Sequence, residues 1–292
     1  MSRFRLCLLG TYLSLALTLP TFAQNGISLY ADSSWTKPYE PFRIAGDVYY
    51  VGTYDLACYL ITTSEGNVLI NTGMPSSVAM IRKSIETLGF KFSDLKILLT
   101  TQAHYDHMGA MAEIRKLTNA KMMVHQGDSS VTADGGNSDF LFGGKGAMYP
   151  PVPVDRVLKD KETITLGGTK ILVLHHPGHT KGATSYLVET KDSKRSWKVL
   201  IANMPSILEQ TRIFGMPTYP NVGKDYAYTL KSLKSLQFDL WVASHASQFN
   251  LHEKRKEGDT YNPSVFGNLK EYDAAVKGYQ GDYDKRIKEE KR

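Results

Sequence analysis

The sequence predicts an α/β fold in which two mixed β-sheets pack face to face and helices cover their outer faces. Two observations predict it. Residues 42–72 alternate as a meander of strands does, and from residue 75 onward amphipathic segments alternate with short apolar ones. The same alternation returns after residue 163, so the chain has enough strands for two sheets.

The first half opens with strands in FRIAGDVYYVG and LACYLITTSEGNVLINTG, which are rich in β-branched and aromatic residues and turn at residues 65–67. PSSVAMIRKSIETLGF follows with apolar residues at spacings of three and four, between Pro75 and Gly89. This pattern predicts an amphipathic helix. LKILLT predicts a short buried strand, and GAMAEIRKLTNA predicts another helix.

The second half predicts a hairpin in TITLGGTKILVLHH, strands in ATSYLVET and WKVLIAN, a helix in YAYTLKSLKSL and a strand in FDLWVASH. No internal repeat marks a boundary, so we expect one domain over residues 24–292.

Between the halves lies TADGGNSDFLFGGKGAMYPPVPVD, which is rich in Gly and Pro and contains several aromatic residues. A loop of this length in a compact domain is usually functional or disordered, and the aromatic residues favour function. We expect exposed aromatic side chains at about residues 135–150, and the hypothesis is that they close over a substrate.

Residues 1–23 have the features of a secretory signal: Arg3 and Arg5, an apolar run, and a small residue at Ala23. We expect cleavage after Ala23 and a periplasmic protein that is not held in the membrane. A membrane anchor is the alternative, but the apolar run is short and ends at Pro20 without a positive flank.

Cleavage would also remove Cys7 and leave Cys58 as the single cysteine, so no intramolecular disulfide could form. Cys58 lies in YDLACYLI, which alternates like a strand. We expect it to be a small buried apolar residue rather than a nucleophile or a metal ligand.

The formal net charge of +6 does not indicate a nucleic-acid surface. Basic residues gather in HEKRKEG and DKRIKEEKR, but acidic residues are interleaved with them, which is typical of solvated faces. We expect a small molecule as the partner, no nucleic acid, and a monomer by default.

The segment LLTTQAHYDHMGA, residues 98–110, ends a predicted strand with Gln102, His104, Asp106 and His107. Alternate residues of an extended segment project in related directions, whereas His107 begins the turn into the next helix. Imidazole and carboxylate groups are zinc ligands, and burying such a cluster without a ligand would be costly. One short segment can therefore serve two metal positions.

Two further histidines directly follow predicted strands, His179 in LVLHHPGHTKG and His245 in LWVASHASQ. Strand ends that converge on one edge of a scaffold commonly present a polar site, so we expect both to join the cluster. His176 is ambiguous and could orient a ligand. Three histidines are expected to be ordinary hydrogen-bonded residues: His125, His175 and His252.

Four motifs, TQAHYDHMGA, HHPGHTKG, LIANMPS and ASHASQF, together resemble those of the metallo-β-lactamase superfamily. The chain is similar to the third subclass of zinc β-lactamases, and especially to its GOB-type members, which carry glutamine where relatives have the first histidine. The resemblance extends over PFRIAGDVYYVGTYDLA, GGNSDFLFG and LHEKRKEGD. It implies an αββα sandwich, the metallo-β-lactamase fold, with a zinc groove at the edge of the sheets.

The resemblance implies two metal positions with three ligands each, the first formed by Gln102, His104 and His179 and the second by Asp106, His107 and His245. A neutral amide oxygen is a weaker zinc donor than imidazole. We therefore expect one or two zinc ions per chain, with the second position the tighter, and the hypothesis is that the enzyme works with one.

The activity implied is hydrolysis of the amide bond of β-lactam antibiotics, including penicillins, cephalosporins and carbapenems, which confers resistance. Zinc lowers the pKa of bound water, so hydroxide can attack the lactam carbonyl, with Asp106 as the catalytic residue that orients it. Ser206 matches a subclass serine that contacts the substrate carboxylate. Met204 stands where most members have a serine, and it cannot donate a hydrogen bond.

Two other functions remain open. Thioesterases and lactonases of this fold typically bridge two metals with an aspartate from the segment that here reads Asn203-Met204, and neither residue is a carboxylate. A non-catalytic periplasmic zinc-binding protein would need closed coordination, whereas three protein ligands per metal leave a position open. A zinc β-lactamase of the first subclass would have a cysteine in that segment, far from Cys58.

Overall fold

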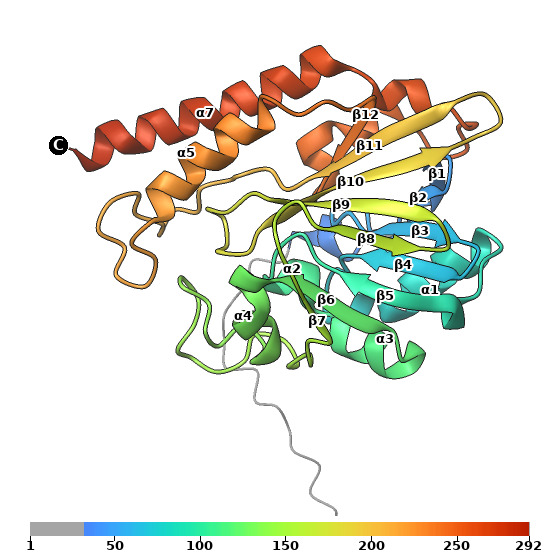
Figure 1. The fold of residues 1–292 in the computed structure, drawn as a ribbon, viewed down its shortest axis with the longest axis horizontal. Helices are drawn as coiled ribbons and strands as arrows, with labels where there is room; N and C mark the ends of the chain where they lie inside the picture. Colours follow the sequence, from blue (N-terminus) through green and yellow to red (C-terminus); the bar gives the residue numbers. More distant parts are fainter. Residues whose placement is uncertain (1–31, 292) are drawn as a thin grey trace, which may run out of the picture. The chain divides into compact units, whose positions relative to one another are not determined.

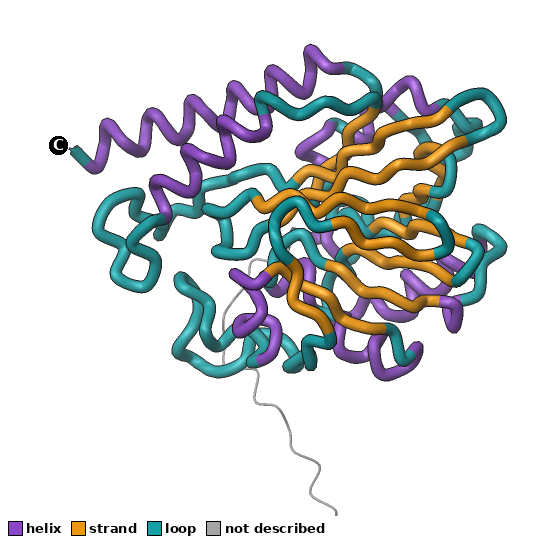
Figure 2. Tube along the Cα trace, in the orientation of Figure 1, coloured by secondary structure: helices purple, strands orange, loops and turns teal. Residues whose placement is uncertain are grey.

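Two β-sheets form the centre of the structure, a computed structural model that describes residues 32–291. The sheets face each other, with helices on both outer faces (Figures 1 and 2). This arrangement confirms the predicted pair of mixed sheets. The expected signal at residues 1–23 lies outside the described residues.

The larger sheet has seven strands in chain order. Its first four strands form the predicted antiparallel meander, and its last four run parallel to one another. The strands are β1 (Phe42–Ala45), β2 (Val48–Tyr50), β3 (Tyr59–Thr63), β4 (Gly66–Ile70), β5 (Leu95–Leu99), β6 (Lys121–His125) and β7 (Arg156–Leu158).

The smaller sheet has five strands in the order β12-β11-β10-β9-β8. Its strands are antiparallel except for β11 and β12, which run parallel. The bounds are β8 (Thr163–Leu166), β9 (Thr169–His175), β10 (Thr184–Lys191), β11 (Ser196–Ala202) and β12 (Leu240–Ala243).

The helices form the two outer layers. Those of the first half pack on the outer face of the larger sheet, and α5 and α7 lie side by side against the smaller sheet (Figure 1). The bounds are α1 (Val78–Thr87), α2 (Tyr105–Met108), α3 (Met111–Thr118), α4 (Ser129–Ala133), α5 (Val222–Leu233), α6 (Leu251–Lys254) and α7 (Leu269–Glu290). Among the described residues, no helix is both long and apolar enough to cross a membrane.

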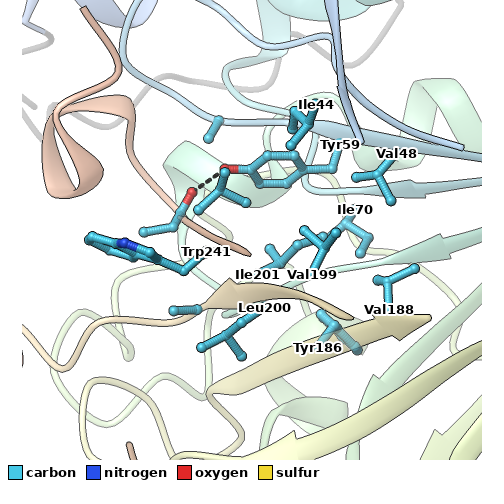
Figure 3. Close-up of a cluster of buried hydrophobic side chains, with 14 of the residues drawn as sticks. Ile44, Val48, Tyr59, Ile70, Tyr186, Val188, Val199, Leu200, Ile201 and Trp241 are labelled. Atoms are coloured by element: carbon cyan, nitrogen blue, oxygen red, sulfur yellow. Dashed lines mark hydrogen bonds between the residues drawn. The ribbon is translucent and has the colours of Figure 1, made fainter. Parts of the chain in front are cut away.

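The strand alternation divides the side chains between two cores. In β3, Tyr59 and Ile61 face the smaller sheet, whereas Leu60 packs under α1 and α3. Figure 3 shows the core between the sheets, where the hydroxyl of Tyr59 donates a hydrogen bond to the carbonyl oxygen of Ala243. Each fully buried Val, Leu or Ile contributes roughly 1.5–3 kcal/mol, so this core holds the strand ends rigidly. Cys58 is fully buried, as predicted.

The expectation of exposed aromatic residues in the loop at 135–150 is wrong for Phe140 and Tyr149. Both are buried. Phe140 packs edge-on against Tyr219 with ring centroids 5.0 Å apart, and the Tyr149 hydroxyl lies 2.8 Å from the carbonyl oxygen of Ala103. Phe140 and Tyr149 thus anchor this loop, and Phe142 is its aromatic residue that stays partly exposed.

Candidate metal centre

The six predicted ligands follow strands that end at one edge of the two sheets. The segment with Gln102 and His107 follows β5, His179 lies between β9 and β10, and His245 follows β12. Parallel pairing of β4 with β5 and of β11 with β12 places the carboxyl ends of each pair together. An isolated bridge between Leu56 and His245 joins the β12 end to the larger sheet.

The structure brings the three residues of the second predicted position into contact. One oxygen of Asp106 lies 3.0 Å from Nε2 of His107 and 3.2 Å from Nε2 of His245. One ligand atom from each of the three lies within 4.8 Å of the others. Burial raises the pKa of Asp106, but the two histidines outweigh this effect and hold that pKa well below its usual value. The carboxylate is therefore charged at neutral pH.

Asp55 orients His245 from the opposite side of the imidazole ring. Its Oδ2 lies 3.0 Å from Nδ1 of His245, and its Oδ1 accepts the backbone N–H of Ser247 at 2.9 Å. Burial lowers the pKa of His245, but hydrogen bonds with Asp106 and Asp55 outweigh it and raise the pKa to about 9. Nε2 is thereby aimed at Asp106, and metal binding there has to displace a proton.

His104 and His179 of the first predicted position also meet. Nδ1 of His104 lies 3.1 Å from Nε2 of His179. Nδ1 of His179 lies 2.8 Å from the carbonyl oxygen of Ser206, which can only accept, so this nitrogen carries the hydrogen and Nε2 has the free lone pair. Burial lowers the pKa of His179 to about 3, which keeps the ring neutral and able to bind a metal.

Gln102, the third predicted ligand of this position, is buried and contacts the residue that follows β11. Its Oε1 accepts a hydrogen bond from Nδ2 of Asn203 at 2.9 Å. Asn203 also donates to the carbonyl oxygen of Thr101 at 2.8 Å. The side-chain amide oxygen of Gln102 therefore keeps one lone pair for a metal.

A buried carboxylate joins the two segments that supply the first position. Oδ2 of Asp128 accepts the backbone N–H of Ala103 at 3.0 Å and the Thr180 hydroxyl at 2.7 Å. Its Oδ1 accepts the backbone N–H of Gly182 at 2.7 Å. The turn around His104 and the loop with His179 are thus held together by one side chain.

These side chains fit zinc by their spacing and by the polar atoms they leave without a partner. Two ligand nitrogens on a tetrahedral zinc lie about 3.3 Å apart, close to the 3.1 Å between His104 and His179. Among the described residues, Nε2 of His107 is buried with no hydrogen-bond partner, although Asp106 is near. Burying an imidazole nitrogen without a hydrogen-bond partner costs folding free energy unless a metal or a proton binds to it.

Ser206 and Met204 occupy different surroundings. Ser206 is partly exposed, and its Oγ lies 3.1 Å from Nδ1 of His179. The Met204 side chain is buried in the core between the sheets. Its apolar side chain therefore contributes to packing and does not replace a hydroxyl at the metal.

The other histidines have hydrogen-bond partners away from the two clusters. His176 lies 2.7 Å from Oγ of Ser185 and 3.0 Å from Oγ of Ser232, so both ring nitrogens are engaged by hydroxyls. The remaining three bond to backbone atoms: His125, His175 and His252. His176 therefore orients none of the predicted ligands directly.

Four supporting residues were not predicted: Asp55, Asp128, Asp139 and Asn203. The hydrogen-bond or ion-pair partner of each lies far away in the sequence. Three of them fall inside stretches of the resemblance, which was the available signal: Asp55 in YVGTYDLA, Asp139 in GGNSDFLFG and Asn203 in LIANMPS. Composition and spacing carry no information about such contacts.

Comparison with known proteins shows the family to which the chain is related. Residues 52–192 match the metallo-beta-lactamase superfamily. The structure is similar to the class B3 di-zinc metallo-beta-lactamase LRA-12 from an Alaskan soil metagenome, at 57% identity and a TM-score of 0.86, covering 88% of this chain and 97% of that one. It is also similar to the metallo-beta-lactamase GOB-18 from Elizabethkingia meningoseptica, at 51% identity and a TM-score of 0.87, covering 88% and 96%.

More distant relatives have other activities. An N-acyl homoserine lactonase from Bacillus is 24% identical over 47% of this chain and 59% of its own length. The chain spans about half the length of the curated relatives it matches, 48% of one and 59% of another. The identities above 50%, which extend over nearly all of two solved structures, say more about the family of this chain than these partial matches do. The chain belongs to the metallo-β-lactamase superfamily, among its class B3 enzymes.

Proposed function

We propose that this protein hydrolyses the amide bond of β-lactam antibiotics with zinc as its cofactor. The observation that carries the proposal is the pair of ligand clusters at one sheet edge, Asp106 with His107 and His245, and His104 with His179. The support from relatives is that similar structures at 51–57% identity are metallo-β-lactamases.

Zinc, when bound, supplies a Lewis acid that lowers the pKa of a coordinated water and stabilises developing negative charge. We assign Gln102, His104 and His179 to one zinc and Asp106, His107 and His245 to the other. Three ligands on each leave a position open for water and substrate.

The chain's own residues orient the reactants. The charged carboxylate of Asp106 accepts a hydrogen bond from the attacking water and fixes its direction. Asp55 keeps the His245 ring in place, and the carbonyl oxygen of Ser206 does the same for His179. We assign to the hydroxyl of Ser206, a partly exposed residue, the role of donating a hydrogen bond to the carboxylate that β-lactams carry.

The stoichiometry proposed is one or two zinc ions, with the Asp106 position the tighter. Its support is chemical: Asp106 supplies a charged oxygen, whereas Gln102 supplies a neutral one that already accepts a hydrogen bond from Asn203. The substrates proposed are penicillins, cephalosporins and carbapenems, and the support is the likeness to metallo-β-lactamases at 51–57% identity.

The proposed location is the periplasm, with cleavage after Ala23 and a single domain over residues 24–292. The support is the pattern of Arg3, Arg5, the apolar run and Ala23. The absence of a nucleic-acid partner is proposed because acidic residues are interleaved with the basic ones, and a monomer is proposed by default.

The second candidate is a lactonase or thioesterase, favoured by the likeness to an N-acyl homoserine lactonase. Against it stands Asn203, whose side-chain nitrogen donates to both Thr101 and Gln102, and Met204, whose side chain is buried. Neither can supply the bridging carboxylate of those enzymes.

The test is hydrolysis of a carbapenem, followed by ultraviolet absorbance, with and without a chelator, and with zinc counted on the same sample. We expect fast hydrolysis that the chelator abolishes and that added zinc restores. An N-acyl homoserine lactone and a glutathione thioester serve as competing substrates. Zinc-loaded protein that cleaves only these would overturn the proposal, and an inert zinc-loaded protein would indicate a zinc-binding protein.

A further inference from the structure

Asp139, in the loop between α4 and β7, contacts a predicted ligand of the first metal position. Its Oδ2 lies 3.4 Å from Nε2 of His104, and its side chain is 2% exposed. Its other oxygen, Oδ1, accepts the backbone N–H groups of Leu141 at 2.8 Å and Phe142 at 2.7 Å. One carboxylate thus joins a metal ligand to the turn formed by residues 139–142.

That turn contacts the site and the neighbouring wall at further points. The Phe142 ring lies edge-on to His104, with centroids 5.4 Å apart. The carbonyl oxygen of Phe140 accepts the Thr218 hydroxyl at 2.8 Å, and the Phe140 ring packs against Tyr219. The turn is therefore held by His104 on one side and by the segment before α5 on the other.

The contact with Asp139 depends on which nitrogen of His104 carries the hydrogen. Nδ1 faces His179 and is the nitrogen that would bind the metal. Once its lone pair is used, the hydrogen of the neutral ring must be on Nε2, which faces Oδ2 of Asp139. A charge-assisted N–H···O bond is about 2.7–2.9 Å long, shorter than the 3.4 Å found here, so metal binding has room to tighten it.

We propose that Asp139 is a positioning residue that couples the first metal position to the 139–142 turn. It fixes the His104 ring for the metal, and the bound metal in turn holds the turn and keeps Phe142 beside His104. Coupling of this kind is reciprocal, so contacts that a substrate makes with the turn also strengthen metal binding. The inference rests on the proposed ligand set.

The test compares wild type with Asp139→Asn, in the zinc-loaded full protein and at limiting zinc. Asparagine keeps an oxygen for the N–H groups of Leu141 and Phe142 but presents an NH₂ group toward Nε2–H of His104. We expect zinc affinity at the first position to fall about 10- to 100-fold, by competition with a chromophoric chelator, with the second position unchanged. In wild type, hydrogen exchange of the Leu141 and Phe142 amides should slow when the first position fills, and in the variant it should not.

Asn137→Ala is the matched control. Oδ1 of Asn137 accepts the backbone N–H of Gly146 at 3.0 Å in the same loop. The control should speed exchange at Gly146 while leaving the affinity of the first position unchanged.

Two results would contradict the proposal, and each contradicts a different part of it. If Asp139→Asn binds zinc at the first position as tightly as wild type, or retains the zinc-dependent exchange, the coupling is wrong although the ligand set stands. If His104→Ala and His179→Ala leave the zinc count and both affinities of wild type intact, the ligand set itself is wrong and the inference fails with it.

Discussion

Nδ2 of Asn203 lies between the carbonyl oxygen of Thr101, at 2.8 Å, and Oε1 of Gln102, at 2.9 Å. The Thr101 carbonyl can only accept, so the nitrogen of Asn203 must face it. The Gln102 atom that faces the same nitrogen must therefore be its oxygen. Hydrogen bonding thus fixes the orientation of both side-chain amides. The oxygen of Gln102 already accepts a hydrogen bond from Asn203 before any metal binds.

Replacing Gln102 by histidine tests its role as a ligand. Imidazole is the stronger zinc donor, so Gln102→His should tighten the first position by about tenfold or more, or about 1.4 kcal/mol. The measurement is zinc retained per chain after dialysis against chelators of graded strength. Gln126→His, at an exposed position, is the control for added surface histidine. An unchanged zinc count would remove Gln102 from the ligand set.

Asp55→Asn should weaken the second metal position. Asp55 accepts from Nδ1 of His245 and from the backbone N–H of Ser247, and loss of a carboxylate behind a ligating imidazole typically costs 10- to 100-fold in metal affinity. Zinc affinity and activity should fall together. Asp94→Asn, an exposed change at the other end of β5, should leave both unchanged. Equal affinities in the two variants would contradict the role given to Asp55.

The sequence was sufficient to predict most of the strands and to place the candidate ligands at strand ends, because both follow local rules. Alternation in β3 separates Tyr59 and Ile61 from Leu60, and the candidate ligands follow apolar strands directly. The strands β6 and β7 were not predicted. Helix α7 was also missed, because over 22 residues only Tyr272 and Val276 are buried, which leaves too weak an apolar stripe.

The supporting residues could not be predicted for a different reason. Asp55 bonds to His245, 190 positions along the chain, and Asn203 to Gln102, 101 positions away. Each contact exists only after the two sheets have packed, and nothing in the local sequence marks the partner. Phe140 was misjudged similarly, since its partner Tyr219 belongs to another loop.

Phe140 and Phe142 should respond differently to truncation, although they are two residues apart. Phe140 is 6% exposed, so Phe140→Ala should lower the free energy of unfolding by about 3–5 kcal/mol. Phe142 is partly exposed beside His104, so Phe142→Ala should chiefly raise KM for β-lactams. Denaturant unfolding and steady-state kinetics on both variants separate these effects. An unchanged KM in Phe142→Ala would count against closure of this loop over substrate.

His176 should make the protein less stable as pH falls. Burial, with a smaller contribution from the charge of His175, lowers the pKa of His176 to about 3, whereas an unfolded histidine titrates near 6.5. Between these values the unfolded state binds more protons, so stability rises with pH up to about 6.5 and is level above it, with a slope of at most about 1.4 kcal/mol per pH unit.

His176→Gln removes this titration while keeping a polar side chain near Ser185 and Ser232. The measurement is urea unfolding at saturating zinc from pH 4.5 to 7.5. Below pH 6.5 the free energy of unfolding should rise less steeply with pH in the variant than in wild type. Above pH 6.5 the two free energies should differ by a constant amount. Saturating zinc keeps the titration of the ligands the same in both proteins. Parallel curves over the whole range would mean that His176 takes up its proton equally in the folded and unfolded states, and that burial does not hold its ring neutral.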